Sequence, residues 1–147
     1  MTEKKAHSKH YSRCCAVQAL YQWHHTRQTA GEIIDQFIAD EHLNLADRKY
    51  FKKLVSGAIA QQAALDEYLL PHLDRGIAEL TPVELAILRL AAFELAYCLE
   101  VPYKVVINEA LEIAKDYGAD QSYKFINGVL DPLASQLRRS GNDSLCG

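Results

Sequence analysis

The segment from Thr81 to Leu99 constrains the fold most, because it combines a clear helix start with a surface that is apolar almost all round. Thr81, Pro82 and Glu84 occupy the N-cap, first helical and capping-box positions of a helix. The residues that follow place apolar side chains on every side: Leu85, Ile87, Leu88, Leu90, Ala91, Phe93, Leu95 and Tyr97. A helix without a polar face has to be enclosed by other elements. The pattern therefore predicts a central helix surrounded by further helices.

Further helices are predicted on both sides of this segment by apolar residues at three- and four-residue spacing. They are expected over about 8–25, over 29–38 from a Thr29–Glu32 capping box, over 44–69 from an Asn44 cap, over 102–117 closed by Gly118, and over 120–137 with a bend at Pro132. No β-branched alternating run is present. The chain is therefore expected to be all-α, a compact bundle of six or seven helices, arranged as two three-helix bundles that share the central helix.

Length and hydropathy place the chain among ordinary globular domains. With 147 residues it can bury roughly two-thirds of the surface that its unfolded form exposes. The hydrophobic residues, 49% of the total, occur in short runs broken by charges, and none approaches the roughly 20 apolar residues needed to span a bilayer. No export signal is recognised in MTEKKAHSKHYSR. A cytoplasmic protein is expected, with a basic flexible arm over 1–12, a helical domain over 13–139 and a frayed tail over 140–147.

The charge of the chain is unevenly distributed. The net charge is −3, yet residues 1–13 carry a net +3, whereas residues 14–147 hold 12 basic and 18 acidic groups and carry a net −6. A short basic arm on an acidic body is typical of proteins that bind a polyanion such as nucleic acid. A disordered tail that only improves solubility would have the same composition. Charge alone does not decide between these two interpretations.

Residue patterns for catalysis or for a cofactor are lacking. The seven glycines are dispersed, so no phosphate-binding loop is formed. Four cysteines, at 14, 15, 98 and 146, show no paired C-x-x-C spacing, and the sulfurs of the neighbours Cys14 and Cys15 would point about 100° apart on a helix. We therefore expect reduced thiols and no catalytic residue, metal or cofactor.

A binding surface is the remaining hypothesis. Arg13, Val17 and Tyr21 follow one another at four-residue spacing on the first helix, so the basic arm could continue onto an aromatic ring. Single-stranded RNA binds to such a combination, because phosphates contact the cations and unstacked bases stack on the ring. Pattern alone nevertheless favours a packing role for Tyr21, and Phe125 at the edge of the last apolar stripe is also a typical packing residue.

Four segments make the chain resemble the NusB family of transcription antitermination factors. They are CAVQALYQW at 15–23, ELTPVELAILRLAAFEL at 79–95, VPYKVVINEALEIAK at 101–115 and KFINGVLD at 124–131. The resemblance implies an all-α double three-helix bundle that binds the boxA element of nascent RNA, more tightly with the ribosomal protein NusE. It also implies a cytoplasmic adaptor that joins the RNA polymerase antitermination complex and promotes read-through in ribosomal RNA operons.

The resemblance also implies which residues bind. An RNA face is expected from Lys4, Lys5, Lys9, His10, Arg13, Tyr21, Gln121, Lys124 and Phe125, and a NusE-facing side from Glu79, Glu84 and Arg89. The chain departs from the usual residues of the NusB family in two ways. Lysines and histidines replace most of the family's arm arginines, which reduces bidentate phosphate contacts, and Gln121 replaces a residue that is often acidic. An RNA-guiding domain for ribosomal RNA modification, a protein-interaction module and a homodimer remain open.

Overall fold

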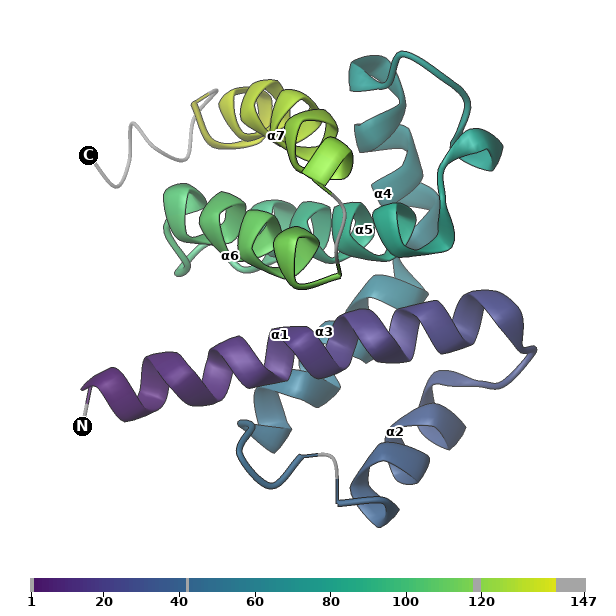
Figure 1. Cartoon of the computed structure of the whole chain (residues 1–147), viewed down its shortest axis with the longest axis vertical. Coiled ribbons are helices and arrows are strands. Elements are labelled where there is room, and N and C mark those ends of the chain that lie inside the picture. The colour runs from purple at the N-terminus through teal and green to yellow at the C-terminus, as the bar shows by residue number, and fades with distance from the viewer. Residues whose placement is uncertain (1, 42, 118–119, 140–147) are drawn as a thin grey trace. The chain divides into compact units, whose positions relative to one another are not determined.

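The computed structural model describes residues 2–41, 43–117 and 120–139, and the side chains of 7–41, 43–117 and 122–138 (Figure 1). These residues form seven α-helices and three short 3-10 or π segments, and no strand is found among them. The predicted all-α class and the number of helices are therefore confirmed. Within the described part of the chain, no helix is both long and apolar enough to cross a membrane.

The chain divides into two compact units, Met1–Ala60 and Gln61–Gly147. Unit 1 contains α1 (Thr2–His25), α2 (Ala30–Ala39) and α3 (Arg48–Ala60). Its three helices pack against one another in pairs. Their shared core includes the rings of Phe37 and Phe51, whose centroids lie 5.6 Å apart, together with the buried side chains of Ala16, Leu20, Ile33 and Leu54.

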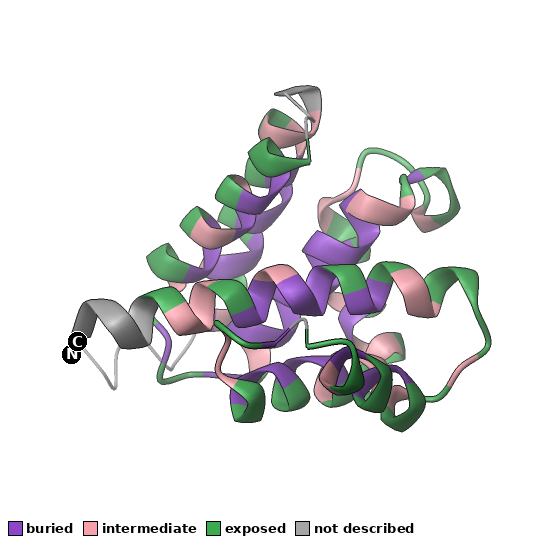
Figure 2. Cartoon of the chain, turned by 60° about the horizontal axis from the view of Figure 1, so that its bottom comes forward, coloured by how far each residue is buried: buried purple, intermediate pink, exposed green. Residues whose placement is uncertain are grey.

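Unit 2 contains four α-helices, α4 (Gln62–Leu69), α5 (Pro82–Tyr97), α6 (Tyr103–Asp116) and α7 (Asp120–Ala134). Short segments at Leu70–His72 and Ile77–Glu79 connect α4 to α5, and a π segment over Ser135–Arg139 follows α7. Helix α5 packs against α4, α6 and α7, and all twelve residues from Glu84 to Leu95 are buried (Figure 2). The prediction of an enclosed helix is confirmed.

Local capping signals produced the most accurate predictions of helix starts. Both capping boxes form: the Thr29 amide donates to Glu32 Oε1 over 2.9 Å and the Glu32 amide to Thr29 Oγ1 over 3.1 Å. The corresponding distances for Thr81 and Glu84 are 3.0 and 3.1 Å. Each box satisfies two of the backbone amides that a helix start leaves without a partner.

Three predicted boundaries were wrong. Helix α1 begins at Thr2 rather than near Ser8, so residues 2–12 of the expected arm are helical in this structure. The cap of α3 is Asp47, whose Oδ1 accepts from the Tyr50 amide over 3.0 Å, and not Asn44. The expected long helix over 44–69 is interrupted at Gln61, which separates α3 from α4. Gly118 and the tail 140–147 lie outside the described residues.

The C-terminal end of α5 is closed by the buried side chain of Arg138. Its guanidinium donates to four backbone carbonyls, those of Leu95 (2.8 Å), Glu94 (3.3 Å), Cys98 (3.2 Å) and Val101 (2.9 Å). The last carbonyls of a helix lack intrahelical partners and carry partial negative charge. Arg138 therefore supplies both the donors and the positive charge that this helix end requires.

Candidate nucleic-acid interface

The basic residues of α1 meet the start of α3 around the ring of Tyr50. The Lys9 ammonium lies 5.0 Å and the Arg13 guanidinium carbon 5.4 Å from the centroid of this ring. Cations over an aromatic face are attracted by the negative potential of the ring. Arg13 is only 4% exposed, so it packs against α3 and does not continue an open face toward Tyr21.

Hydrogen bonds hold the start of α3 against α1. The Asp47 amide donates to the Ser8 carbonyl (3.2 Å) and to Ser12 Oγ (2.9 Å). The Ser12 hydroxyl in turn contacts the Ser8 and Asp47 carbonyls at 2.9 and 2.7 Å. Ser12 is completely buried. The position of α3 next to residues 8–13 of α1 is therefore fixed by directional bonds.

Tyr21 lies on the surface, which contradicts the packing role that its spacing favoured. Its side chain is 42% exposed, and its ring lies edge-to-face against His25 with the centroids 4.5 Å apart. The ring borders a surface groove of about 520 Å³, a volume within the roughly 300–1,000 Å³ typical of small-ligand sites. The groove is formed by α1, the loop after it and α2, and is lined by Gln18, Tyr21, Gln22, His25, Thr26, Gln36, Phe37 and Asp40.

Side-chain amides give this groove its hydrogen-bonding character. Gln22 Nε2 donates to Oε1 of Gln28 (2.8 Å) and of Gln36 (2.7 Å), and Gln28 Nε2 lies 3.3 Å from Gln36 Oε1. A glutamine amide offers two donor hydrogens and an acceptor oxygen. The groove thus places side-chain amides, together with the carboxylate of Asp40, beside an exposed ring. Amide donors and acceptors can hydrogen-bond the edge of a nucleobase while the ring stacks on its face.

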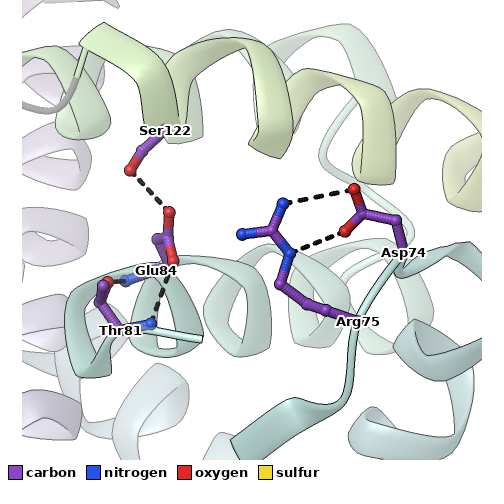
Figure 3. Close-up of polar contacts among 5 residues, drawn as sticks. All are labelled: Asp74, Arg75, Thr81, Glu84 and Ser122. Carbon is purple, nitrogen blue, oxygen red and sulfur yellow. Dashed lines mark hydrogen bonds and ion pairs between the residues drawn. The ribbon is translucent and has the colours of Figure 1, made fainter. Parts of the chain in front are cut away.

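Phe125 is half-buried, and its ring is covered by a cation that the sequence did not reveal. The Arg75 guanidinium carbon lies 4.5 Å from the ring centroid. Arg75 is also paired with Asp74 at 2.7 and 3.3 Å (Figure 3). The hydrogen bond between these side chains raises the pKa of Arg75 and lowers the pKa of Asp74. Fifty residues separate Arg75 from Phe125, so no local spacing could have predicted this contact.

The structure describes the side chains of only some of the other residues predicted to contact RNA. Lys124 is exposed on α7, and His10 is half-buried on α1 with its Nε2 3.6 Å from the Cys14 sulfur. The side chains of Lys4, Lys5 and Gln121 lie outside the described residues. Their roles stay predictions.

Two of the three residues predicted to face NusE have internal partners. Glu84 is 8% exposed and, besides its capping box, accepts from the Ser122 hydroxyl over 2.7 Å (Figure 3). Arg89 is 9% exposed and binds Asp66 through two hydrogen bonds of 2.9 Å each. Only Glu79 is exposed. The binding role of all three stays a prediction, and the structure adds an internal contact for Glu84 and Arg89.

The histidine, cysteine and carboxylate side chains of the described residues are dispersed. No group of three or more His, Cys, Asp or Glu side chains is placed there to hold a metal ion. Cys15 and Cys98 are buried, Cys14 is half-buried, and none of the three is in a disulfide. Burial raises the pKa of the Cys15 thiol, which keeps this side chain in its less nucleophilic protonated form.

Comparison with known proteins identifies the family. The model of the NusB family matches residues 10–135. The chain belongs to the NusB family. The matched range includes Tyr21, Lys124 and Phe125, whereas Lys4, Lys5 and Lys9 precede it.

Individual members of the NusB family align over most of this chain. It is 47% identical to a transcription antitermination protein NusB of Pasteurella multocida over 137 residues, 93% of this chain and 95% of the relative. It is 50% identical to the protein of that name from Psychromonas ingrahamii over 127 residues, 86% of this chain and 88% of the relative. Similarity extends to a crystal structure of the antitermination factors NusB and NusE in complex with dsRNA. The matched chain has 27% identity and a TM-score of 0.78, and the match covers 86% of this chain and 96% of that one.

Proposed function

We propose that this NusB family member is a transcription antitermination factor. It binds boxA-type single-stranded RNA together with NusE, acts in the cytoplasm and promotes read-through in ribosomal RNA operons without catalysing a reaction. The names of its relatives and the NusE and RNA complex of its structural neighbour support the proposal. The observation that carries it is the exposed ring of Tyr21, which borders a groove of hydrogen-bonding side chains on α1 and α2.

The groove and the cations of α1 would contribute to RNA binding in different ways. An unstacked base that stacks on Tyr21 gains about 1 to 3 kcal/mol and can exchange hydrogen bonds with the amides beside it. Phosphates would be attracted by the cations that α1 carries before Tyr21, including Lys9. This electrostatic contribution depends on salt because binding releases counterions from the nucleic acid. Affinity should therefore combine a salt-independent part from stacking with a salt-dependent part from phosphates.

Titration of labelled boxA RNA with and without NusE, at two salt concentrations, tests the proposal. We expect binding that is tighter with NusE and that weakens as the salt concentration rises. An unrelated single strand and a duplex of the same length serve as controls, since the structural neighbour was solved with dsRNA. Absence of binding with NusE present, or binding that does not respond to salt, would contradict the proposal.

Replacement of Tyr21 tests the observation that carries the proposal. Tyr21→Ala should weaken boxA binding by about 5- to 150-fold, because the stacking surface worth about 1 to 3 kcal/mol is removed. Thermal stability should change little, since the ring is 42% exposed. Tyr117→Ala is a matched control, because Tyr117 is 41% exposed at the end of α6 in the other unit. Equal losses in both variants would show that Tyr21 has no specific role.

A further inference from the structure

Helix α3 carries four cations on the side opposite to its buried residues. Arg48, Lys49, Lys52 and Lys53 are all exposed, whereas the opposite side buries Tyr50, Phe51, Leu54, Val55 and Ala58. At about 100° per residue, the four cations span an arc of about 140° that contains none of the buried positions. We call these four residues the basic face of α3. The net charge of −6 over residues 14–147 conceals these cations, because many acidic residues follow them in the sequence.

Helix α3 packs on α1 through the side that carries Tyr50. The hydrogen bonds of Asp47 with Ser8 and Ser12 hold the first turn of α3 against α1. Lys9 reaches over the ring of Tyr50 on α3. Both contacts lie within unit 1. The basic face of α3 therefore lies on the side of the helix away from these contacts with α1, where its four cations are exposed.

Acidic residues are scarce in the sequence of α3 and of the loop before it. Asp47 is the sole acidic residue between Leu43 and Ala60, and its carboxylate accepts a hydrogen bond from the Tyr50 amide at the start of α3. Unit 1 as a whole contains nine basic and six acidic residues, a net charge of +3, whereas unit 2 contains seven basic and thirteen acidic residues, a net charge of −6. Clustered charge of one sign raises the local concentration of ligands of opposite sign.

We infer that the basic face of α3 binds the phosphate backbone of the RNA. The inference rests on the proposed function and adds to it the surface that contacts the phosphates. Four flexible cations without an exposed aromatic ring among them suit a polyanion rather than bases, because a lysine ammonium is a strongly hydrated point charge. The basic face also supplies positive charge that a lysine- and histidine-containing arm would otherwise provide alone.

The variant Lys49→Gln/Lys52→Gln tests this inference in the full chain with NusE. Glutamine and lysine have similar helix propensities, so α3 should remain intact. Each phosphate contact of a single strand contributes about 0.7 to the slope of log affinity against log salt concentration. Loss of two contacts should reduce the slope by about 1.4 and weaken boxA binding at about 0.1 M salt by roughly tenfold or more. The losses should be similar for unrelated single strands, because phosphate contacts carry no sequence information.

A control with the same change of net charge separates a local contact from a general electrostatic effect. Lys104 and Lys115 are exposed on α6 in unit 2, and Lys104→Gln/Lys115→Gln should leave the salt slope unchanged. The conservative variant Lys49→Arg/Lys52→Arg should retain both the affinity and the slope. If the α3 and α6 variants lose affinity equally, or if the α3 variant keeps the original slope, the inference is wrong although RNA binding by the unaltered chain still supports the proposed function. Absence of RNA binding by the unaltered chain would overturn both.

Discussion

The two units of the molecule place their charged residues differently. Among the described residues, unit 2 buries four charged side chains, Glu84, Arg89, Glu94 and Arg138, whereas unit 1 buries only Arg13. In unit 2, cations such as Arg89 and Arg138 join helices to one another or to helix ends. In unit 1, the four cations of α3 face solvent. Whether a cation is buried or exposed, and not how many cations a unit contains, therefore distinguishes a structural cation from a candidate binding cation.

This difference follows from the cost of burying a charge. A buried cation is tolerated only where acceptors replace the water that it loses, and four carbonyls or a bidentate carboxylate fulfil this requirement in unit 2. An exposed lysine keeps its water and contributes little to stability. Substitutions in unit 2 should thus reduce stability first, and substitutions on the basic face of α3 should reduce RNA binding first.

The largest expected effect comes from Arg138. Arg138→Met keeps much of the apolar stem but removes the side-chain donor from four carbonyls at and after the end of α5. The Glu94 and Cys98 carbonyls keep the backbone amides of Cys98 and Val101 as donors, so the loss falls mainly on the carbonyls of Leu95 and Val101. Hydrogen bonds to a charged group contribute about 1.5 to 3 kcal/mol, and buried acceptors without partners are costly. We expect the free energy of unfolding in urea to fall by about 3 kcal/mol.

A second variant keeps this prediction testable if Arg138→Met does not fold. Arg138→Lys retains the charge but cannot reach four carbonyls with one ammonium group, so an intermediate loss is expected. RNA affinity, measured at a temperature where each variant is folded, should be unchanged. Loss of RNA binding from a fully folded variant would break the division of roles between the units.

The sequence predicted features that depend on neighbouring residues and missed those that depend on packing. Thr29 with Glu32 and Thr81 with Glu84 were predicted correctly because a capping box is formed within one turn. The contacts of Arg89 with Asp66 and of Arg75 with Phe125 span 23 and 50 residues, so they follow only from the folded arrangement. Tyr21 illustrates the limit of periodicity, since its spacing fits a buried face although the ring lies on the surface.

The Arg89 and Asp66 pair gives the next largest effect and tests whether Arg89 also contacts NusE. The two side chains are 11% and 17% exposed, so removal of one partner leaves a largely buried charge. Arg89→Met and Asp66→Asn should each lower the free energy of unfolding by about 2 kcal/mol. The double variant should lose less than the sum, because the two substitutions remove one shared interaction.

Affinity for NusE then distinguishes the two roles of Arg89. If Arg89 acts only through its pair with Asp66, both single variants should bind NusE equally well at a temperature where they are folded. A specific loss in Arg89→Met would show that the arginine contacts the partner, and it would mean that a structural cation of unit 2 also binds.

The smallest expected effect concerns Glu32 at the start of α2, an exposed carboxylate in unit 1 with a structural role. Hydrogen bonds from the Thr29 backbone and side chain lower the pKa of Glu32. Because the folded state favours the carboxylate, the stabilisation is present above the unfolded pKa of about 4.3 and is lost as the pH falls through the lower folded value. The free energy of unfolding should therefore decrease less between pH 5 and pH 3 in Glu32→Gln than in the unaltered chain. Asp35→Asn, which removes a charge from the same helix outside the capping box, should retain the original pH dependence. A Glu32→Gln profile that matches those of the unaltered chain and the Asp35 variant would show that the capping carboxylate does not contribute to acid sensitivity.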